Sequence, residues 1–328
     1  MRLSSCSIWA FMLFDVRSST IPDWVIKFKG PAPQVLTWKL PAGLYVRSII
    51  HGSTHAKAGH WGMLLGKRRS TGWWYYFPVV AAYKVPIGIG VTMLLGLISF
   101  RALKFAWREW GLLIPAVAWT ILMMTSHLNI GFRHFLPAYV FMLMLATRCV
   151  APGISRWMTI TALAAIAITT VDVARWHPDE LSYINHPGGR PYLSISDSNV
   201  DWGQGLQQVC DWLRAHPTYA SRPIALRDFG GPKQVRKLKA QYWLGRNVRM
   251  LESEVPDSGI LIISKVWVGG PYDKTDLYKP LRNLRAVADI GHAVLVYDVD
   301  MLKRRGEWPF SQKARKPATS PSTKAVQK

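Results

Sequence analysis

Gly72-Trp73-Trp74-Tyr75-Tyr76-Phe77-Pro78 runs directly into an apolar segment, Val79 to Phe100. Consecutive aromatic rings match the core of a soluble protein poorly, whereas Trp and Tyr collect where a chain crosses from lipid headgroups into hydrocarbon. We therefore interpret this stretch as an aromatic belt at a membrane surface. It divides a polar, irregular region before it from apolar segments after it.

Four apolar segments approach the roughly 20 helical residues that cross a bilayer core of about 30 Å. They are Val79 to Phe100, Trp110 to Ser126, Phe132 to Val150 and Trp157 to Val173. We expect each of them to be a full transmembrane helix. A shorter apolar run, Ile8 to Phe14, has no Ala-x-Ala-like cleavage site after it. That run is interpreted as a partial or re-entrant transmembrane helix, with a signal anchor as the alternative.

The chain has a net charge of +22 because Lys and Arg outnumber Asp and Glu. In a soluble protein, such a charge would suggest a nucleic-acid partner. Lys and Arg beside membrane spans account for much of this charge, and no nucleic-acid-binding motif accompanies it, so we expect no nucleic-acid partner. The three cysteines, Cys6, Cys149 and Cys210, are far apart and form no CxxC pair. They predict neither a disulfide framework nor a zinc site.

Three histidines, His51, His55 and His60, are spaced four and five residues apart, and residues four apart share a helix face. Such a pair can ligate a metal. However, no carboxylate or Cys completes a ligand set, and Gly52 and Gly59 disfavour a helix in this segment. We therefore favour the absence of a metal site, and no cofactor is predicted.

Basic residues mark two short connections, with Arg101, Lys104 and Arg108 in one and Arg148 and Arg156 in the other. Cytoplasmic connections carry an excess of Lys and Arg. Both connections are therefore expected in the cytoplasm, and the aromatic belt and the C-terminal region outside it. This predicts a multi-pass protein of the cell inner (cytoplasmic) membrane.

Short runs rich in Ile, Val and Leu follow the last apolar segment and predict buried strands. They are Tyr192 to Ser196, Pro223 to Arg227, Gly259 to Ser264 and Ala293 to Val299. The apolar residues of the stretch 206–213 recur at helical spacing, and Lys233 to Trp243 is a candidate second helix. Strands that alternate with helices predict a small α/β domain.

The expected fold is an α-helical transmembrane region of about four full spans plus a partial N-terminal one, followed by a small α/β extracytoplasmic domain. Its five parts are a partial transmembrane helix at 1–15, an extracytoplasmic loop at 16–78, a four-helix transmembrane region at 79–173, the α/β domain at 174–302 and a basic tail at 303–328. The tail is rich in Lys, Pro, Ser and Thr, a composition typical of disorder.

The first candidate site is the stretch 197–204, which sets polar side chains between a predicted strand and a predicted helix. Its candidate ligand-binding residues are Asp197, Asn199, Asp201 and Gln204. Carboxylates and amides of this kind suit contact with a sugar or a phosphate. The structural alternative is a capping box, in which Asp201 caps the helix and Gln204 reaches back to it.

The second candidate site consists of three basic residues, Lys84, Arg133 and His134, expected at the same outer membrane interface. A phosphate in a low dielectric is costly unless positive charge pairs with it. These residues are therefore candidates for binding a lipid phosphate. The alternative is that the two long side chains simply extend to the headgroups.

Four stretches, read in order, resemble bacterial multi-spanning glycosyltransferases of the GT-C type, similar to protein mannosyltransferases and aminoarabinose transferases. The first is Gly72 to Pro78 with Lys84-Val85-Pro86, and the second is Leu128 to Pro137. The third is Asp197 to Gln204, and Ile290 to Tyr297 adds a fourth. Together they cover roughly Ile8 to Val299.

The resemblance implies transfer of a sugar from a polyprenyl-phosphate donor to an acceptor outside the cytoplasm. It implies that Lys84 and Arg133 bind the lipid phosphate, with His134 beside them, and that the polar residues of 197–204 organise the outer domain. Family members place an acidic residue, often Asp beside Glu, in their first outer loop as a general base. Here the acids of that loop are Asp15 and Asp23, which form no such pair.

The chain is accordingly expected to match the C-terminal portion of such an enzyme, and no catalytic base is assigned. Its expected partners are a polyprenyl-phosphate-linked sugar, membrane lipid and a separate N-terminal half. The alternative function is a membrane-anchored binding protein that performs no chemistry.

Overall fold

The computed structural model describes residues 60–102, 106–185, 190–230, 247–273 and 275–310. The chain divides into two compact units, Met1–His60 and Trp61–Lys328, and all described residues except His60 belong to the second. Three predictions therefore lie outside the described residues: the partial helix at 1–15, the helix at 233–243 and the tail beyond 310. His51 and His55, where no metal site is expected, also lie outside them.

A β-hairpin occupies part of the expected irregular loop before the aromatic stretch. Strands β1 (Gly62–Leu64) and β2 (Lys67–Arg69) pair antiparallel. The two residues between them, Leu65 and Gly66, both have positive φ, which suits a tight hairpin turn. Leu64 forms an isolated bridge with Ile195, so the hairpin is tied to a segment far along the chain.

The aromatic stretch is part of the protein core and does not form a belt. Helix α3 spans Tyr76–Lys84, and its buried residues Tyr76, Phe77 and Val80 follow the spacing of one helix face, while Trp73 is buried just before the helix. Phe77 is 0% exposed and stacks on Phe135, with ring centroids 6.0 Å apart. Trp74 lies on the other side and is 67% exposed. The expectation of a belt was wrong for Trp73, Tyr76 and Phe77, because these rings are buried inside the protein.

The first expected membrane span is broken. Helix α4 (Ile87–Ala102) follows α3 after a bend of 119°. The bend lies at Val85-Pro86, where Val85 has an extended ψ of 123°. Proline disfavours the helical conformation in the residue before it and lacks the N–H that a continuous helix needs.

The expectation of four full spans was wrong. The further long helices are α5 (Trp110–Thr125), α6 (Leu136–Ala146) and α7 (Arg156–Ala174). The described residues form nine α-helices. Among these, only α7 is long and apolar enough to cross a membrane, and a second candidate span exists if the bent α3–α4 pair is counted as one span. A helix of 16 residues, such as α4 or α5, is only about 24 Å long.

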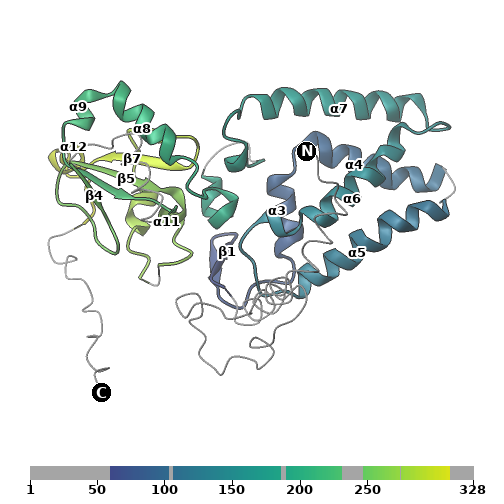
Figure 1. Ribbon diagram of the computed structural model, residues 1–328, viewed down its shortest axis with the longest axis horizontal. Coiled ribbons are helices and arrows are strands. Elements are labelled where there is room, and N and C mark those ends of the chain that lie inside the picture. Colours follow the sequence, from purple (N-terminus) through teal and green to yellow (C-terminus); the bar gives the residue numbers. More distant parts are fainter. Residues whose placement is uncertain (1–59, 103–105, 186–189, 231–246, 274, 311–328) are drawn as a thin grey trace, which may run out of the picture. The chain divides into compact units, whose positions relative to one another are not determined.

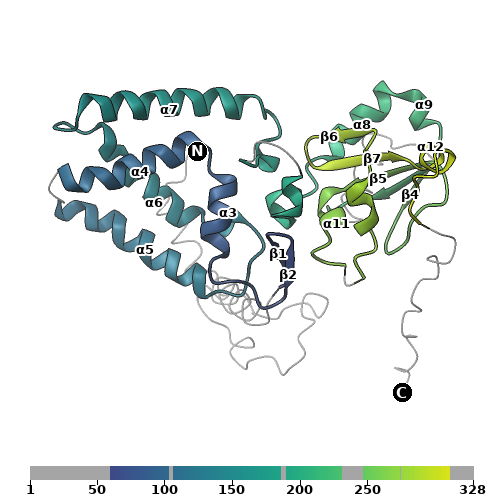
Figure 2. The same cartoon turned by 180° about the vertical axis from the view of Figure 1, so that it is seen from behind.

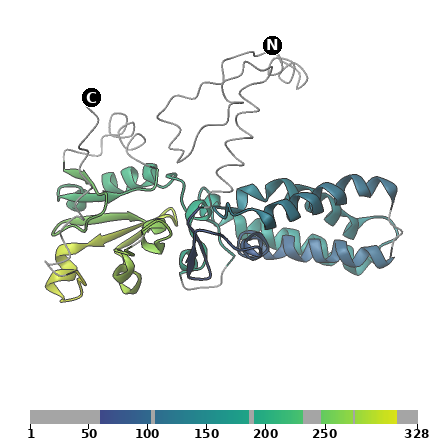
Figure 3. The same cartoon turned by 90° about the horizontal axis from the view of Figure 1, so that it is seen from below.

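The long helices pack beside one another through small residues (Figures 1 and 3). Helix α4 contacts α6 and α7, and α5 contacts α6. A Cβ on Gly96 would collide with Ala146, and one on Gly88 would collide with Ala165. These contacts permit a close helix–helix approach. Short 3₁₀ turns, η2 (Trp107–Glu109), η3 (Phe132–His134) and η4 (Thr147–Val150), flank the helices.

The C-terminal region forms a mixed five-stranded sheet in the order β4-β3-β5-β7-β6 (Figures 1 and 2). Its strands are β3 (Ile224–Arg227), β4 (Val248–Met250), β5 (Ile260–Ser264), β6 (Ala288–Ile290) and β7 (Val294–Asp298). Strand β3 pairs parallel with β4 and β5, whereas β7 pairs antiparallel with β5 and β6. Three of the four predicted strands are confirmed. Tyr192 to Ser196 is not a strand, because it begins in the 3₁₀ helix η6 (Pro191–Leu193).

Four α-helices accompany the sheet: α8 (Leu206–Ala215), α9 (Pro217–Ala220), α11 (Lys265–Gly269) and α12 (Val299–Arg304). Helix α8 confirms the predicted helical spacing, and its buried residues pack against Ile260 and Ile262 of the sheet. Three more 3₁₀ turns, η5 (Glu180–Ser182), η7 (Asp197–Asn199) and η8 (Lys279–Asn283), complete the region.

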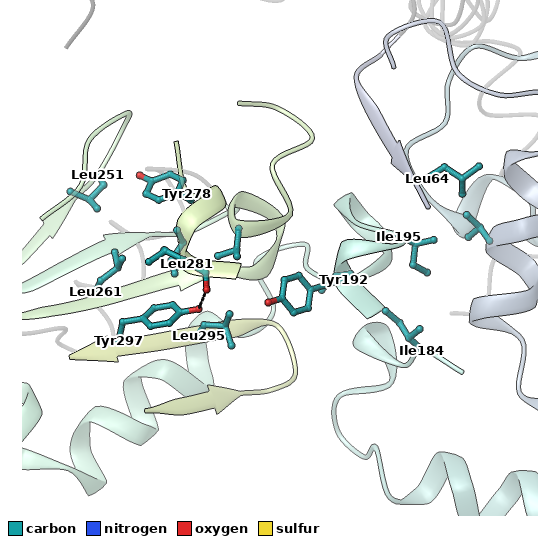
Figure 4. Close-up of a cluster of buried hydrophobic side chains, with 14 of the residues drawn as sticks. Leu64, Ile184, Tyr192, Ile195, Leu251, Leu261, Tyr278, Leu281, Leu295 and Tyr297 are labelled. Carbon is teal, nitrogen blue, oxygen red and sulfur yellow. Dashed lines mark hydrogen bonds between the residues drawn. The ribbon is translucent and has the colours of Figure 1, made fainter. Parts of the chain in front are cut away.

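One hydrophobic cluster extends from the sheet to helix α3. It includes Leu261 and Tyr297 of the sheet and Phe77 of α3. It also includes Tyr192 and Ile195 of the segment between α7 and α8, which we call the connecting segment. Figure 4 shows several of these side chains, with the Tyr297 hydroxyl donating to the Leu281 carbonyl at 3.2 Å. The connecting segment is therefore anchored to both regions.

Candidate functional site

Three segments of the chain, 72–78, 128–137 and 197–204, meet and form what we call the junction. The amide of Trp73 donates to Asn129 Oδ1 at 2.6 Å. Asn199 links the other two segments, because its Oδ1 accepts from the Phe132 amide at 2.9 Å and its Nδ2 donates to the Tyr76 hydroxyl at 3.0 Å. Both asparagines are buried. Three of the four stretches on which the family resemblance rests thus lie together.

Two glycines allow the segments of the junction to approach. Gly72 has φ +71°, and a Cβ there would collide with the Asn129 side chain. A Cβ on Gly131 would collide with Ser198, whose hydroxyl donates to the Ile130 carbonyl. Larger residues at either position would separate the segments.

Lys84 lies at the junction, where its side chain links helix α3 to backbone carbonyls of two other segments. Its ammonium donates to the carbonyls of Leu181, Tyr183 and Asn199 at 2.8, 2.6 and 2.9 Å. An ammonium has three N–H donors, so these bonds use all of them. The geometry therefore supports a structural role for Lys84, whose predicted role was to bind a lipid phosphate.

Arg133 is exposed, and its guanidinium lies 4.0 Å from the ring centroid of Trp202. Its Nε donates to His134 Nε2 at 3.4 Å. Among the described residues, the two terminal nitrogens of Arg133 have no hydrogen-bond partner. A guanidinium that lies over an indole ring in this way can keep its outer N–H donors available for an anion.

Asp197 is buried at the junction, with 2% of its surface exposed, and has a left-handed backbone with φ 67°. Its Oδ1 accepts from the Ser198 amide, and its Oδ2 accepts from the Tyr272 hydroxyl. Burial raises the pKa of Asp197 to about 6, although the Tyr272 bond and the charge of Arg133 oppose the rise. This carboxylate connects the 197–204 segment to the loop after α11.

Asp201 and Gln204 fix the same segment but do not cap a helix. Asp201 accepts from the Gly203 amide at 2.7 Å and from the Ser264 hydroxyl, and burial raises its pKa. Gln204 accepts from the Trp202 amide at 2.6 Å and donates to the Val200 carbonyl at 3.1 Å. The predicted capping box is absent here because helix α8 begins only at Leu206, with Gly205 as its N-cap residue.

Four neighbouring aromatic rings form what we call the aromatic cluster: Trp202, Phe229, Trp267 and Tyr272. Trp202 lies beside Arg133, and the Tyr272 hydroxyl donates to Asp197. Phe229 stacks on Tyr272 at 5.7 Å and lies 6.0 Å from Trp202, while Trp267 lies 6.2 Å from Phe229. A second guanidinium, that of Arg227, lies 3.7 Å from the Trp267 ring centroid.

Sequence reasoning missed three members of the aromatic cluster, although a signal existed. Phe229 follows strand β3 and Trp267 follows strand β5, and these strands are parallel neighbours. The carboxyl ends of parallel strands share one sheet edge, where ligands commonly bind. Tyr272 belongs to the loop after α11 and carried no comparable signal.

Within the described part of the chain, no group of three or more His, Cys, Asp or Glu side chains could hold a metal ion. Comparisons with protein families, with curated proteins and with solved structures found no match to this chain. The chemistry of the junction and the aromatic cluster is therefore the main guide to function.

Proposed function

We propose that this chain is a membrane glycosyltransferase component that binds a polyprenyl-phosphate-linked sugar at the junction and takes part in its transfer to an acceptor. The observation that carries this proposal is the exposed Arg133 guanidinium, which lies over the Trp202 ring at the end of an apolar helical region. The guanidinium suits the lipid phosphate, and the neighbouring rings suit the sugar.

The surface of the helical region supports immersion in lipid. Large apolar side chains are exposed on all of the helices α4 to α7, including Leu97 at 64% and Ile168 at 69%. Exposed apolar surface of this extent is unfavourable in water. A helix that is apolar on every side is typical of a lipid or core environment.

Arg133 has the geometry to bind a phosphate at the edge of that lipid phase. It lies in η3, immediately before the apolar helix α6. Its two terminal nitrogens can donate side by side to two phosphate oxygens, an arrangement stronger than a single neutral hydrogen bond. The polyprenyl chain would then extend along the apolar helices.

The aromatic cluster provides the surface for the sugar. The Trp202 ring is 50% exposed directly beside Arg133. One face of a sugar ring carries mainly C–H groups and packs on aromatic rings, while its hydroxyls bond to polar neighbours. A sugar attached to a phosphate on Arg133 would therefore reach Trp202.

In the transfer step, an acceptor oxygen bonds to the anomeric carbon while the bond from that carbon to the phosphate oxygen breaks. The polyprenyl phosphate leaves with the electron pair, and Arg133 stabilises its negative charge. A base takes the acceptor proton. We do not assign that role to Asp197 or Asp201, because both are buried and bonded inside the protein. Asp15 and Asp23 lie outside the described residues.

The burial of these two carboxylates favours one alternative, a protein that binds the lipid-linked sugar without chemistry. Membranes that contain the chain, supplied with radiolabelled sugar on polyprenyl phosphate, distinguish the two functions. Release of labelled product above that of membranes lacking the chain indicates transfer. Retention of the label without product indicates binding alone.

The phosphate assignment is tested with purified chain and a fluorescent polyprenyl phosphate. Arg133→Gln removes a charge-assisted hydrogen bond worth about 1.5–3 kcal/mol, so the Kd should rise roughly 10- to 100-fold. The matched control is Arg156→Gln, because Arg156 is also exposed and lies 5.4 Å from the centroid of an exposed Trp157 ring. Equal weakening by both variants would refute a specific site at Arg133.

A further inference from the structure

An apolar groove runs between helices α4 and α7, apart from the aromatic cluster. Its volume is about 760 Å³, which is within the usual range for small-molecule sites. Its apolar wall is formed by Ile87, Val91, Ala165, Ala167, Ile168 and Val171. Polar side chains gather at one end, where α7 leads into the segment 175–185.

The two helices cannot close the groove further. A Cβ at Gly88 would collide with the Ala165 carbonyl and the Thr169 hydroxyl, so the backbones already touch there. Thr169 Oγ1 is buried and has no hydrogen-bond partner in the structure. The groove is thus a fixed feature of the α4–α7 packing.

The polar end of the groove carries one positive and one negative side chain. Arg175 is exposed, and its guanidinium has no hydrogen-bond partner among the described residues. Asp172 accepts from the Tyr183 hydroxyl through Oδ2 at 2.7 Å, while the described residues provide no donor to its Oδ1. Trp176 lies beside them. Trp is common at the headgroup level of membranes.

We propose that this groove binds a phospholipid with a zwitterionic amine headgroup, of the phosphatidylethanolamine class. One acyl chain lies along the apolar wall, Arg175 pairs with the phosphodiester, and Asp172 Oδ1 accepts from the ammonium. The inference rests on the proposed membrane location of the helices but not on sugar transfer.

The opposite charges of Arg175 and Asp172 at the polar end of the groove favour a zwitterionic headgroup over an anionic one. Arg175 alone would favour any phosphodiester, but Asp172 is only three residues away on the same helix turn. A headgroup with a phosphate and no cation would meet the Asp172 carboxylate without a compensating charge. An ammonium on the headgroup satisfies that carboxylate.

The test uses the full chain, purified and placed in nanodiscs or mixed micelles with equal amounts of dioleoyl phosphatidylethanolamine and dioleoyl phosphatidylglycerol. Bound lipid is counted by native mass spectrometry. We expect the parent to retain the ethanolamine lipid at least fivefold over the glycerol lipid. Asp172→Asn keeps an acceptor for Tyr183 but removes the charge, so this preference should disappear.

Three further variants separate the contribution of the lipid headgroup from that of its acyl chain. Arg175→Gln should lower retention of both lipids about tenfold. Ala167→Phe fills the groove and should also abolish retention, whereas Ala164→Phe, on an exposed part of α7 outside the groove, should leave it unchanged. Equal retention of the two lipids by the parent, or equal loss in both Phe variants, would overturn the proposal.

The result is distinguishable from that of the proposed function. Arg133→Gln should keep the ethanolamine lipid while losing polyprenyl phosphate, and Arg175→Gln should do the reverse. Loss of polyprenyl phosphate in both variants would refute two separate sites. A parent that binds the ethanolamine lipid selectively but shows no affinity for polyprenyl phosphate would support the groove and refute only the proposed function.

Discussion

Replacing Asp197 by Asn should make the protein more stable at neutral pH. Asp197 is buried between Tyr272 and the Ser198 amide, and its carboxylate is charged at pH 7 because its pKa is about 6. Asn has nearly the same shape. Its Oδ1 can accept from Ser198, and its amide group can donate to the Tyr272 oxygen, so both hydrogen bonds have a replacement.

The size of the effect follows from the pKa. A rise from 3.8 in the unfolded chain to about 6 in the folded protein corresponds to roughly 3 kcal/mol. Because the folded pKa is the higher one, the folded state binds more protons between these values. The contribution of Asp197 to stability is therefore complete below about pH 4 and is lost as the pH rises through 6.

The assay is the free energy of unfolding of purified chain in a neutral detergent, measured at pH 4.5, 5.5 and 7.5. The difference between Asp197→Asn and the parent should grow in favour of the variant with rising pH, to about 2–3 kcal/mol at pH 7.5. Asp211→Asn, which removes an exposed carboxylate from α8, controls for the change of net charge. A variant less stable than the parent at pH 7.5, or parallel profiles, would refute the reasoning.

Three substitutions test the packing of the same unit, each by its free energy of unfolding. Phe77→Ala empties a fully buried position and should cost about 3–5 kcal/mol, and a loss below 1 kcal/mol would contradict its place in the core. Gly72→Ala forces a side chain into φ +71° and into Asn129, so a loss of about 1–3 kcal/mol is expected, and a neutral result would exclude this junction geometry. Arg148→Gln leaves its ion-pair partner Glu109 unpaired and should cost on the order of 3 kcal/mol, against little change for the exposed Arg156→Gln.

Local patterns predicted the regular elements of the C-terminal region well. Runs of Ile, Val and Leu located β3, β5 and β7, and the spacing of Leu206 and its neighbours located α8. The edge strands β4 and β6 have only three residues each and carried no clear pattern. The order and direction of strands depend on contacts between distant segments, which one sequence does not specify.

The helical region was harder to predict from the sequence, because hydrophobicity alone does not determine helix length. The apolar segment from Val79 to Phe100 was long enough for a span, but Pro86 divides it. The aromatic stretch had two compatible interpretations, since the rings at 73, 76 and 77 suit either a membrane interface or one buried helix face. Burial was decided by distant partners such as Phe135.

The sequence identified several residues of the candidate site, but it did not predict the role of each residue. Arg133, Asn199 and Asp197 were assigned to two separate candidate sites, and the structure brings them together at the junction. The role of Lys84 was hidden, because its three carbonyl acceptors belong to residues 97 to 115 positions away. The aromatic cluster likewise depends on the arrangement of strands.

The most direct test of the central claim is to locate a bound lipid-linked sugar on the protein. A sugar polyprenyl phosphate with a photoactivatable group on the isoprene nearest the phosphate is irradiated with the purified chain, and labelled peptides are mapped by mass spectrometry. We predict label on residues around Arg133 and Trp202, competed by unlabelled polyprenyl phosphate and lost in Arg133→Gln. Label that is spread evenly over the apolar helices, or unchanged in Arg133→Gln, would contradict a binding site at the junction.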